Sequence, residues 1–83
     1  MNTTQYYMIT FASTHGAIST KSYLGTTIPI VIMPTLREVS KSCGIAIRVA
    51  PEHIEQAKQL MQQGSIKDYH MYYIDGKEIE QIK

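Results

Sequence analysis

The sequence has few of the features that mark secreted or membrane proteins. One cysteine occurs among 83 residues, so no disulfide can form within the chain, and this fits a reducing compartment. No apolar run approaches the ~18 residues that a membrane-spanning helix needs. The first five residues have neither the basic region nor the apolar core of a secretion signal. We therefore expect a cytoplasmic protein without a membrane partner.

Excess charge is also lacking, since the net charge is +1 and only 18% of the residues are charged. Proteins that hold nucleic acid through phosphate contacts normally carry a clustered basic face, so we expect no nucleic-acid partner. The hydrophobic fraction, 43%, is that of a folded protein rather than a disordered one. The length predicts a single domain over residues 1–83, with a core at about 6–74 and a polar tail at 75–83.

The apolar pattern predicts four strands and two helices. Strands are expected at residues 6–11, 28–33, 45–49 and 70–74, where β-branched and aromatic residues gather or alternate with other residues. A first helix is expected after a cap at Ser13 or Thr14, with a buried stripe of Ala17, Ile18, Leu24 and Ile28 and an end at Gly25. A second helix is expected to begin at Pro51, to bury Ile54, Ala57, Leu60 and Met61, and to end at Gly64.

This order of elements predicts an α+β domain of the ferredoxin-like split βαβ kind, with a four-stranded antiparallel sheet and two helices on one face. The other face of the sheet, with Tyr6 and Met8, would then be open. Open faces of this kind often pair with a partner, so a homodimer through this face is one expectation.

The ten-residue link from Pro34 to Cys43 is the first place to look for chemistry. It is long for a hairpin connection, which usually has two to five residues, and it ends with the only thiol beside Gly44. The predicted topology brings the start of the first helix, with Ser13, Thr14 and His15, to the same edge of the sheet. The free N–H groups of a helix start lower the pKa of a thiol and stabilise a thiolate or persulfide.

Cationic side chains near the link would strengthen this effect. Arg37, Lys41 and His15 are the candidates, whereas Arg48 lies roughly 16 Å further along its strand. Each residue also has a structural interpretation: Cys43 as a packing residue, Arg37 as a solvated loop residue and His15 as part of a helix start. Cys43 and His15 supply at most two metal ligands per chain, and there is no cofactor loop, so we expect neither a metal nor a cofactor.

The residues of the link also carry a family resemblance. The run from Pro34 to Arg48, together with residues 7–17 and Ile28-Pro29, resembles a family of small bacterial selenium/sulfur carrier protein-like domains over about residues 6–74. The shared motif consists of Pro34, Thr35, Arg37, Glu38, Ser42, Cys43, Gly44, Ala46 and Arg48. Leu36 departs from it where the family typically has a second proline, and residues 75–83 extend past its usual end.

The resemblance implies that Cys43 accepts sulfur or selenium as a persulfide or perselenide and passes it on. The implied partners are donor and acceptor proteins, and the implied supporting residues are Arg37, His15, Thr14, Ser42, Gly44 and Arg48. A solitary cysteine suits a carrier better than a disulfide reductase, which typically uses a Cys-x-x-Cys pair. The alternative function is a non-catalytic module that forms a homodimer or senses a small anion. Under both hypotheses, we expect a carrier or accessory protein rather than an independent enzyme.

Overall fold

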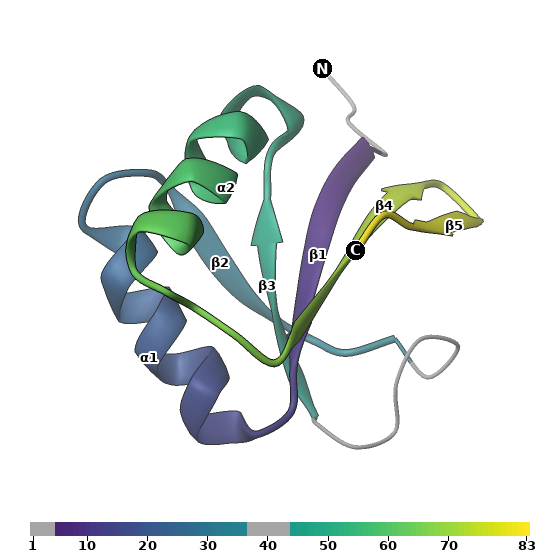
Figure 1. The fold of residues 1–83 in the computed structure, drawn as a ribbon. Helices are drawn as coiled ribbons and strands as arrows, with labels where there is room; N and C mark the ends of the chain where they lie inside the picture. The colour runs from purple at the N-terminus through teal and green to yellow at the C-terminus, as the bar shows by residue number, and fades with distance from the viewer. Residues whose placement is uncertain (1–4, 37–43) are drawn as a thin grey trace.

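The computed structural model describes residues 5–36 and 44–83. This part of the chain is an α+β domain in which two α-helices pack on an antiparallel sheet (Figure 1). Its elements are β1 (Gln5–Phe11), α1 (Thr14–Gly25), β2 (Ile30–Pro34), β3 (Ile45–Val49), the 3-10 turn η1 (Pro51–His53), α2 (Ile54–Gln63), β4 (Tyr69–Asp75) and β5 (Glu78–Gln81).

The sheet has five strands in the described residues, so the prediction of four was wrong. The difference is β5, which pairs antiparallel with β4 through Ile74 and Ile79 after a turn at Gly76, whose φ is +62°. Beyond β5, the Ile82 N–H donates to the Met71 carbonyl at 2.9 Å. β5 has one apolar residue, Ile79, among its four residues, so its sequence lacks the apolar alternation that predicts a half-buried strand. All four residues are exposed.

The strand order is β2-β3-β1-β4-β5, with β1 at the centre. β1 pairs antiparallel with both β3 and β4, and β2 pairs antiparallel with β3. β1 and β2 therefore end at the same end of the sheet at which β3 and β4 begin. The register there places Thr10 opposite Ala46 and Phe11 opposite Tyr69. β2 is an edge strand. A proline at position 29 predicts either an edge strand or the first residue of a strand, and the structure has the edge, with Pro29 just before β2.

Both helices cover the same face of the sheet (Figure 1). The main core lies between them and the sheet and consists of Ile9, Phe11, Ala17, Leu24, Ile28, Ile47, Val49, Ile54, Ala57, Met61 and Met71. The two helices are also joined directly, because the Tyr23 hydroxyl donates to the Leu60 carbonyl at 2.9 Å. The predicted inward face of the first strand, which includes Ile9 and Phe11, is confirmed.

α1 is a helix with little amphipathic pattern of its own. It buries Ala17, Thr20 and Leu24, and it leaves Ile18 53% exposed. The prediction that Ile18 belongs to the buried stripe was therefore wrong, whereas the end at Gly25 is confirmed. A polar residue inside and an isoleucine outside weaken the periodic signal, so packing against the sheet stabilises this helix more than its pattern does.

α2 matches its prediction closely along its buried face. Ile54, Ala57 and Met61 are buried and Leu60 is partly buried against the core. Pro51 begins the 3-10 turn η1 rather than the α-helix itself, so the helical chain starts where expected with a tighter first turn.

The face of the sheet opposite the helices has a second, smaller cluster. Met8, Ala46, Tyr72 and Ile74 are buried there, and Met8 and Ala46 have no exposed surface at all. The predicted strand parity, with Tyr6 and Met8 away from the helices, is confirmed, but Met8 does not lie on an open surface. The register puts exposed Val31 on this face through its pairing with Arg48.

Candidate functional site

The two described flanks of the cysteine-bearing link lie side by side. The β2–β3 ladder ends with Pro34 opposite Ile45, and the Thr35 N–H then donates to the Gly44 carbonyl at 3.2 Å. This hydrogen bond continues the pairing beyond both strands. The link therefore leaves the sheet through a closed neck, formed by Pro34, Thr35, Gly44 and Ile45.

Thr35 has an unusual environment within the neck. Its hydroxyl oxygen is buried, and no hydrogen-bond partner for it exists in the described part of the chain. Buried polar groups are nearly always paired, and an unpaired one costs free energy. The next residue, Leu36, is partly buried against the cluster of Met8 and Tyr72, so the neck is anchored to the sheet on its apolar side.

Ser13 is the N-cap of α1, and it is one of the two candidates, Ser13 and Thr14, that the sequence predicted. Its backbone is extended, with φ −144°, and its Oγ accepts a hydrogen bond from the Gly16 N–H at 3.1 Å. Thr14 and His15 follow as exposed residues of the first turn. Because the first N–H groups of a helix have no partner within it, those of Thr14 and His15 remain directed out of the helix end.

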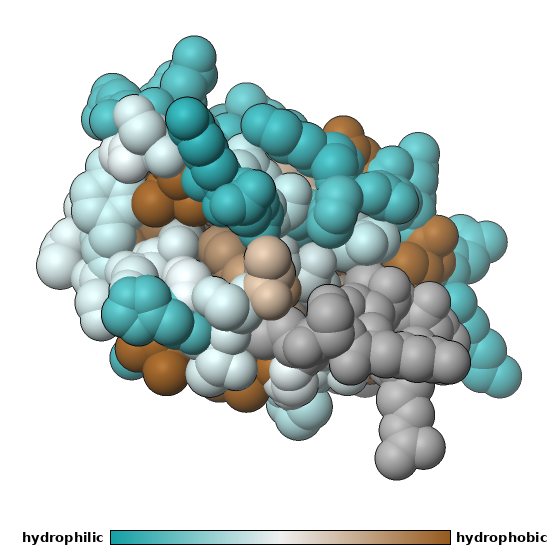
Figure 2. Space-filling model, turned by 60° about the horizontal axis from the view of Figure 1, so that its bottom comes forward, coloured by the Kyte–Doolittle hydropathy of each residue, from teal (hydrophilic) through white to brown (hydrophobic). Residues whose placement is uncertain are grey.

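The neck and the start of α1 lie at one end of the sheet. Thr10, near the end of β1, pairs with Ala46, near the start of β3. The chain therefore leaves β1 toward Ser13 at the same end of the sheet at which Gly44 leads into β3. The Ala12 N–H also donates to the Asp68 carbonyl at 3.1 Å, which ties the start of β4 to the same end. The described surface in this view is a mixture of hydrophilic residues and residues of intermediate hydropathy, with separate apolar patches (Figure 2).

The predicted site residues fall into three groups: those outside the described residues, those at this end of the sheet, and Arg48, which lies elsewhere. Cys43, Arg37 and Ser42 lie outside the described residues, so their positions stay predictions. Thr14, His15 and Gly44 lie at the end of the sheet just described. Gly44 is exposed, and a Cβ built on it would meet nothing within 4 Å.

Arg48 lies apart from this end of the sheet. Its guanidinium carbon lies over the Tyr6 ring, 4.3 Å from the ring centroid, which is a cation–π contact. It lines a hollow of about 350 Å³ with Gln5 and His53, near the start of β1. The structure thus brings the flanks of the link to the start of α1 but does not bring Arg48 there.

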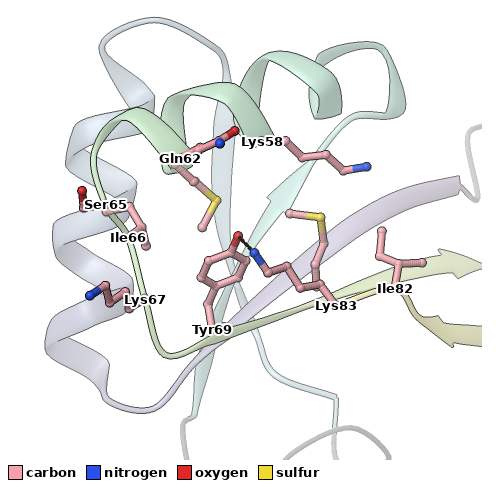
Figure 3. Close-up of a pocket in the computed structure, with 10 residues that line it drawn as sticks. Lys58, Gln62, Ser65, Ile66, Lys67, Tyr69, Ile82 and Lys83 are labelled. Atoms are coloured by element: carbon pink, nitrogen blue, oxygen red, sulfur yellow. Dashed lines mark hydrogen bonds between the residues drawn. The ribbon is translucent and has the colours of Figure 1, made fainter.

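Two features of the structure were absent from the site that the sequence predicted. One is Thr35, for which the family motif itself was an available signal. The other is a pocket between α2 and β4 on the helix side of the sheet, lined in part by Lys58, Tyr69 and Lys83 (Figure 3). No local pattern indicates this pocket, because it depends on the position of the residues that follow β5.

The described residues contain neither a grouped set of metal ligands nor a membrane-spanning helix. In residues 5–36 and 44–83, no three His, Cys, Asp or Glu side chains are grouped as metal ligands would be. Within the same ranges, no helix is long and apolar enough to cross a membrane.

Comparison with known proteins identifies the family. The antiparallel sheet and the two helices make this an α+β domain. Residues 6–73 match the family described as "Putative Se/S carrier protein-like". The match covers most of the chain and spans the link, so the chain belongs to this family. No curated protein and no solved structure matches it significantly.

Proposed function

We propose that this protein carries sulfur or selenium on Cys43. The family match over residues 6–73, which spans Cys43 and its flanks, is the observation that carries the proposal. The closed neck supports it, because the Thr35–Gly44 hydrogen bond fixes the residue that follows the cysteine. The start of α1 at the same end of the sheet supports it as well, since free N–H groups there favour an anion.

The carrier cycle needs no oxidant or reductant. The Cys43 thiolate attacks the terminal sulfur of a donor persulfide, so a sulfur–sulfur bond forms on Cys43 as the donor bond breaks and its electron pair leaves on the donor thiolate. A thiolate of the acceptor then attacks the same terminal sulfur, and the Cys43 thiolate is released. The same two steps transfer selenium when the terminal atom of the donor is selenium instead of sulfur.

Helix N–H groups at Thr14 and His15, with Arg37 from the link, would stabilise the anionic persulfide. This arrangement follows from the order β1, α1, β2, β3, α2, β4, which we interpret as the ferredoxin-like split βαβ with β5 added beside β4. The strand order of β2-β3-β1-β4 supports that interpretation.

Mass spectrometry of the intact protein tests the proposal. After incubation with a low-molecular-weight persulfide, wild type should gain the mass of one sulfur atom, and C43S should gain none. A second protein thiol should then remove the sulfur from the wild type. Because Cys43 is the only cysteine, the pH dependence of its alkylation should report one midpoint, below the ~8.5 of a free thiol. Slow alkylation at every pH, with normal reactivity after unfolding, would make Cys43 a packing residue and overturn the proposal.

The homodimer through the sheet face stays a prediction. Val31, 60% exposed, and Ile79, 37% exposed, are the large apolar residues that this face offers. They lie on opposite edge strands, with the buried residues Met8 and Ala46 between those edges. Sedimentation measurements with wild type and V31K would test it.

A further inference from the structure

A pocket lies between α2 and β4, on the helix side of the sheet. It has a volume of about 590 Å³, which is within the usual range for sites that bind small molecules. We call it the α2–β4 pocket and define it by Lys58, Met61, Lys67, Tyr69, Met71 and Lys83. It contains none of the described residues of the neck or of the start of α1, so it is separate from the candidate carrier site.

The charge of the pocket is of one sign. Lys58, Lys67 and Lys83 line it, and no acidic side chain of the described chain does. Of these three lysines, Lys58 has a carboxylate within ion-pair distance in the described residues, Glu55 at 3.5 Å, and both side chains of that pair are largely exposed. An anion that entered the pocket would therefore meet lysine side chains and no Asp or Glu side chain of the described residues.

Two polar groups meet at the centre of the pocket. The Lys83 ammonium donates to the Tyr69 hydroxyl oxygen at 2.9 Å and lies 4.8 Å from the centroid of its ring (Figure 3). Because the tyrosine oxygen accepts from Lys83, its own O–H proton remains able to donate elsewhere. The ammonium has two further protons, so the pair presents several donors to one point. In the same view Lys58 and Lys67 lie on opposite sides of this pair, and their ammonium ends point away from it.

The rest of the pocket is apolar. Met61 and Met71 form a fully buried base, and Ile66 and Ile82 flank it. Ile82 is 41% exposed, so a ligand would remove apolar surface from water there. An inorganic anion would leave this surface uncovered.

We propose that the α2–β4 pocket binds a small amphipathic organic anion. Its carboxylate or phosphate group lies against Lys83 and Tyr69, and its apolar part covers Ile66 and Ile82. Lys58 and Lys67 add attraction from either side. The pocket thereby gives this carrier domain a binding site for a small metabolite in addition to the cysteine.

Titration of the full chain with phenyl phosphate, followed in ¹⁵N–¹H NMR spectra, tests the proposal. Phenyl phosphate has an anionic group and an apolar ring, inorganic phosphate has the charge alone, and benzyl alcohol has the ring alone. We expect phenyl phosphate to shift the amide signals of residues 65–71 and 83 in a saturable way. The two partial probes should bind more weakly.

Charge-matched variants make the test specific. K83Q should raise the Kd of phenyl phosphate roughly ten-fold, the effect of losing a charge-assisted hydrogen bond. K21Q removes one exposed charge from α1, outside the pocket, and should change the Kd by no more than about two-fold. Y69F should weaken binding while its ring keeps the packing.

Equal losses in K83Q and K21Q would overturn the proposal, because they would show general attraction to a basic surface. Inorganic phosphate bound as tightly as phenyl phosphate would overturn the amphipathic assignment. C43S should bind like wild type, so the pocket and the carrier function can fail independently of each other.

Discussion

The backbone N–H of Thr35 donates to the carbonyl of Gly44 at 3.2 Å, and this bond joins the two ends of the link that carries the cysteine. It extends the β2–β3 ladder by one step past Pro34 and Ile45. The residue that directly follows Cys43 is therefore hydrogen-bonded to the other end of the link, one step beyond the last residue pair of the sheet. A reactive group on a loop gains precision when the loop is anchored to a rigid element in this way.

The Thr35 side chain allows a test of the neck. Its buried hydroxyl has no partner in the described residues, so T35V, which replaces it with a methyl group of similar size, should keep or raise the unfolding free energy, by up to about 1 kcal/mol. T35S keeps the hydroxyl and loses the methyl group, so it should be less stable than wild type. Urea denaturation measures both. A loss of more than about 1 kcal/mol in T35V would show that the hydroxyl has a partner after all.

The Ser13 cap should determine the stability of the α1 start. S13A removes the acceptor of the Gly16 N–H and should destabilise the fold by about 1 kcal/mol. S13D keeps an acceptor at the same position and should remain close to wild type. Thermal or urea unfolding, compared across the three proteins, checks this. Equal stability of S13A and S13D would contradict a capping role for the side chain.

Gly64 lies against the ring of Tyr23, so it is expected to tolerate no side chain. A Cβ there would stand 2.9 Å from Tyr23 Cε2, and that ring is held by its hydrogen bond to Leu60. The φ of Gly64, −82°, suits any residue, so the backbone does not oppose a substitution. The clash with the ring should therefore make G64A destabilising, by roughly 1–3 kcal/mol.

G25A is the matched control for that substitution. A Cβ at Gly25 would meet nothing within 4 Å, and its φ is not positive. We therefore expect G25A to be neutral or stabilising, by about 0.4–1 kcal/mol. In a Y23L background the cost of G64A should fall, and an unchanged cost there would exclude the tyrosine ring as its cause.

The raised pKa of Tyr73 predicts that the free energy of unfolding depends on pH in the alkaline range. The Tyr73 ring packs on Tyr7 with centroids 5.0 Å apart, and burial, followed by the nearby Asp75 carboxylate, raises the pKa of its hydroxyl above the ordinary 10.0. The unfolded chain then releases this proton at lower pH than the folded chain does. Between the two pKa values the folded state binds more protons, so its stability falls as pH rises.

Unfolding free energies measured from about pH 9 to about pH 11 check this expectation. Y73F removes the titrating group and should show a shallower decline than wild type. If Y73F and wild type decline in parallel, the pKa of Tyr73 is not shifted in the folded protein.

Much of the domain could be predicted because local physics fixes it. Alternation of apolar residues in β1 and β3 assigns their two faces, since successive side chains of a strand point to opposite sides. Ser13 marks the start of α1 through its hydrogen bond with the Gly16 N–H, and the helix ends at Gly25 as predicted, although the stripe between them is faint. The family motif likewise depends on the order of residues alone, so the family was predicted from the sequence and then confirmed.

Tertiary structure decided the features that depend on distant partners. β5 exists because β4 offers its edge to an exposed segment, and Ile18 is exposed because the sheet packs against Thr20 and Leu24 instead. Arg48 stacks on Tyr6, and Lys83 reaches Tyr69, through registers that join segments far apart in the chain. A sequence pattern reports which side chains share one face of one element, whereas a pocket or a stacked pair needs the relative placement of two elements.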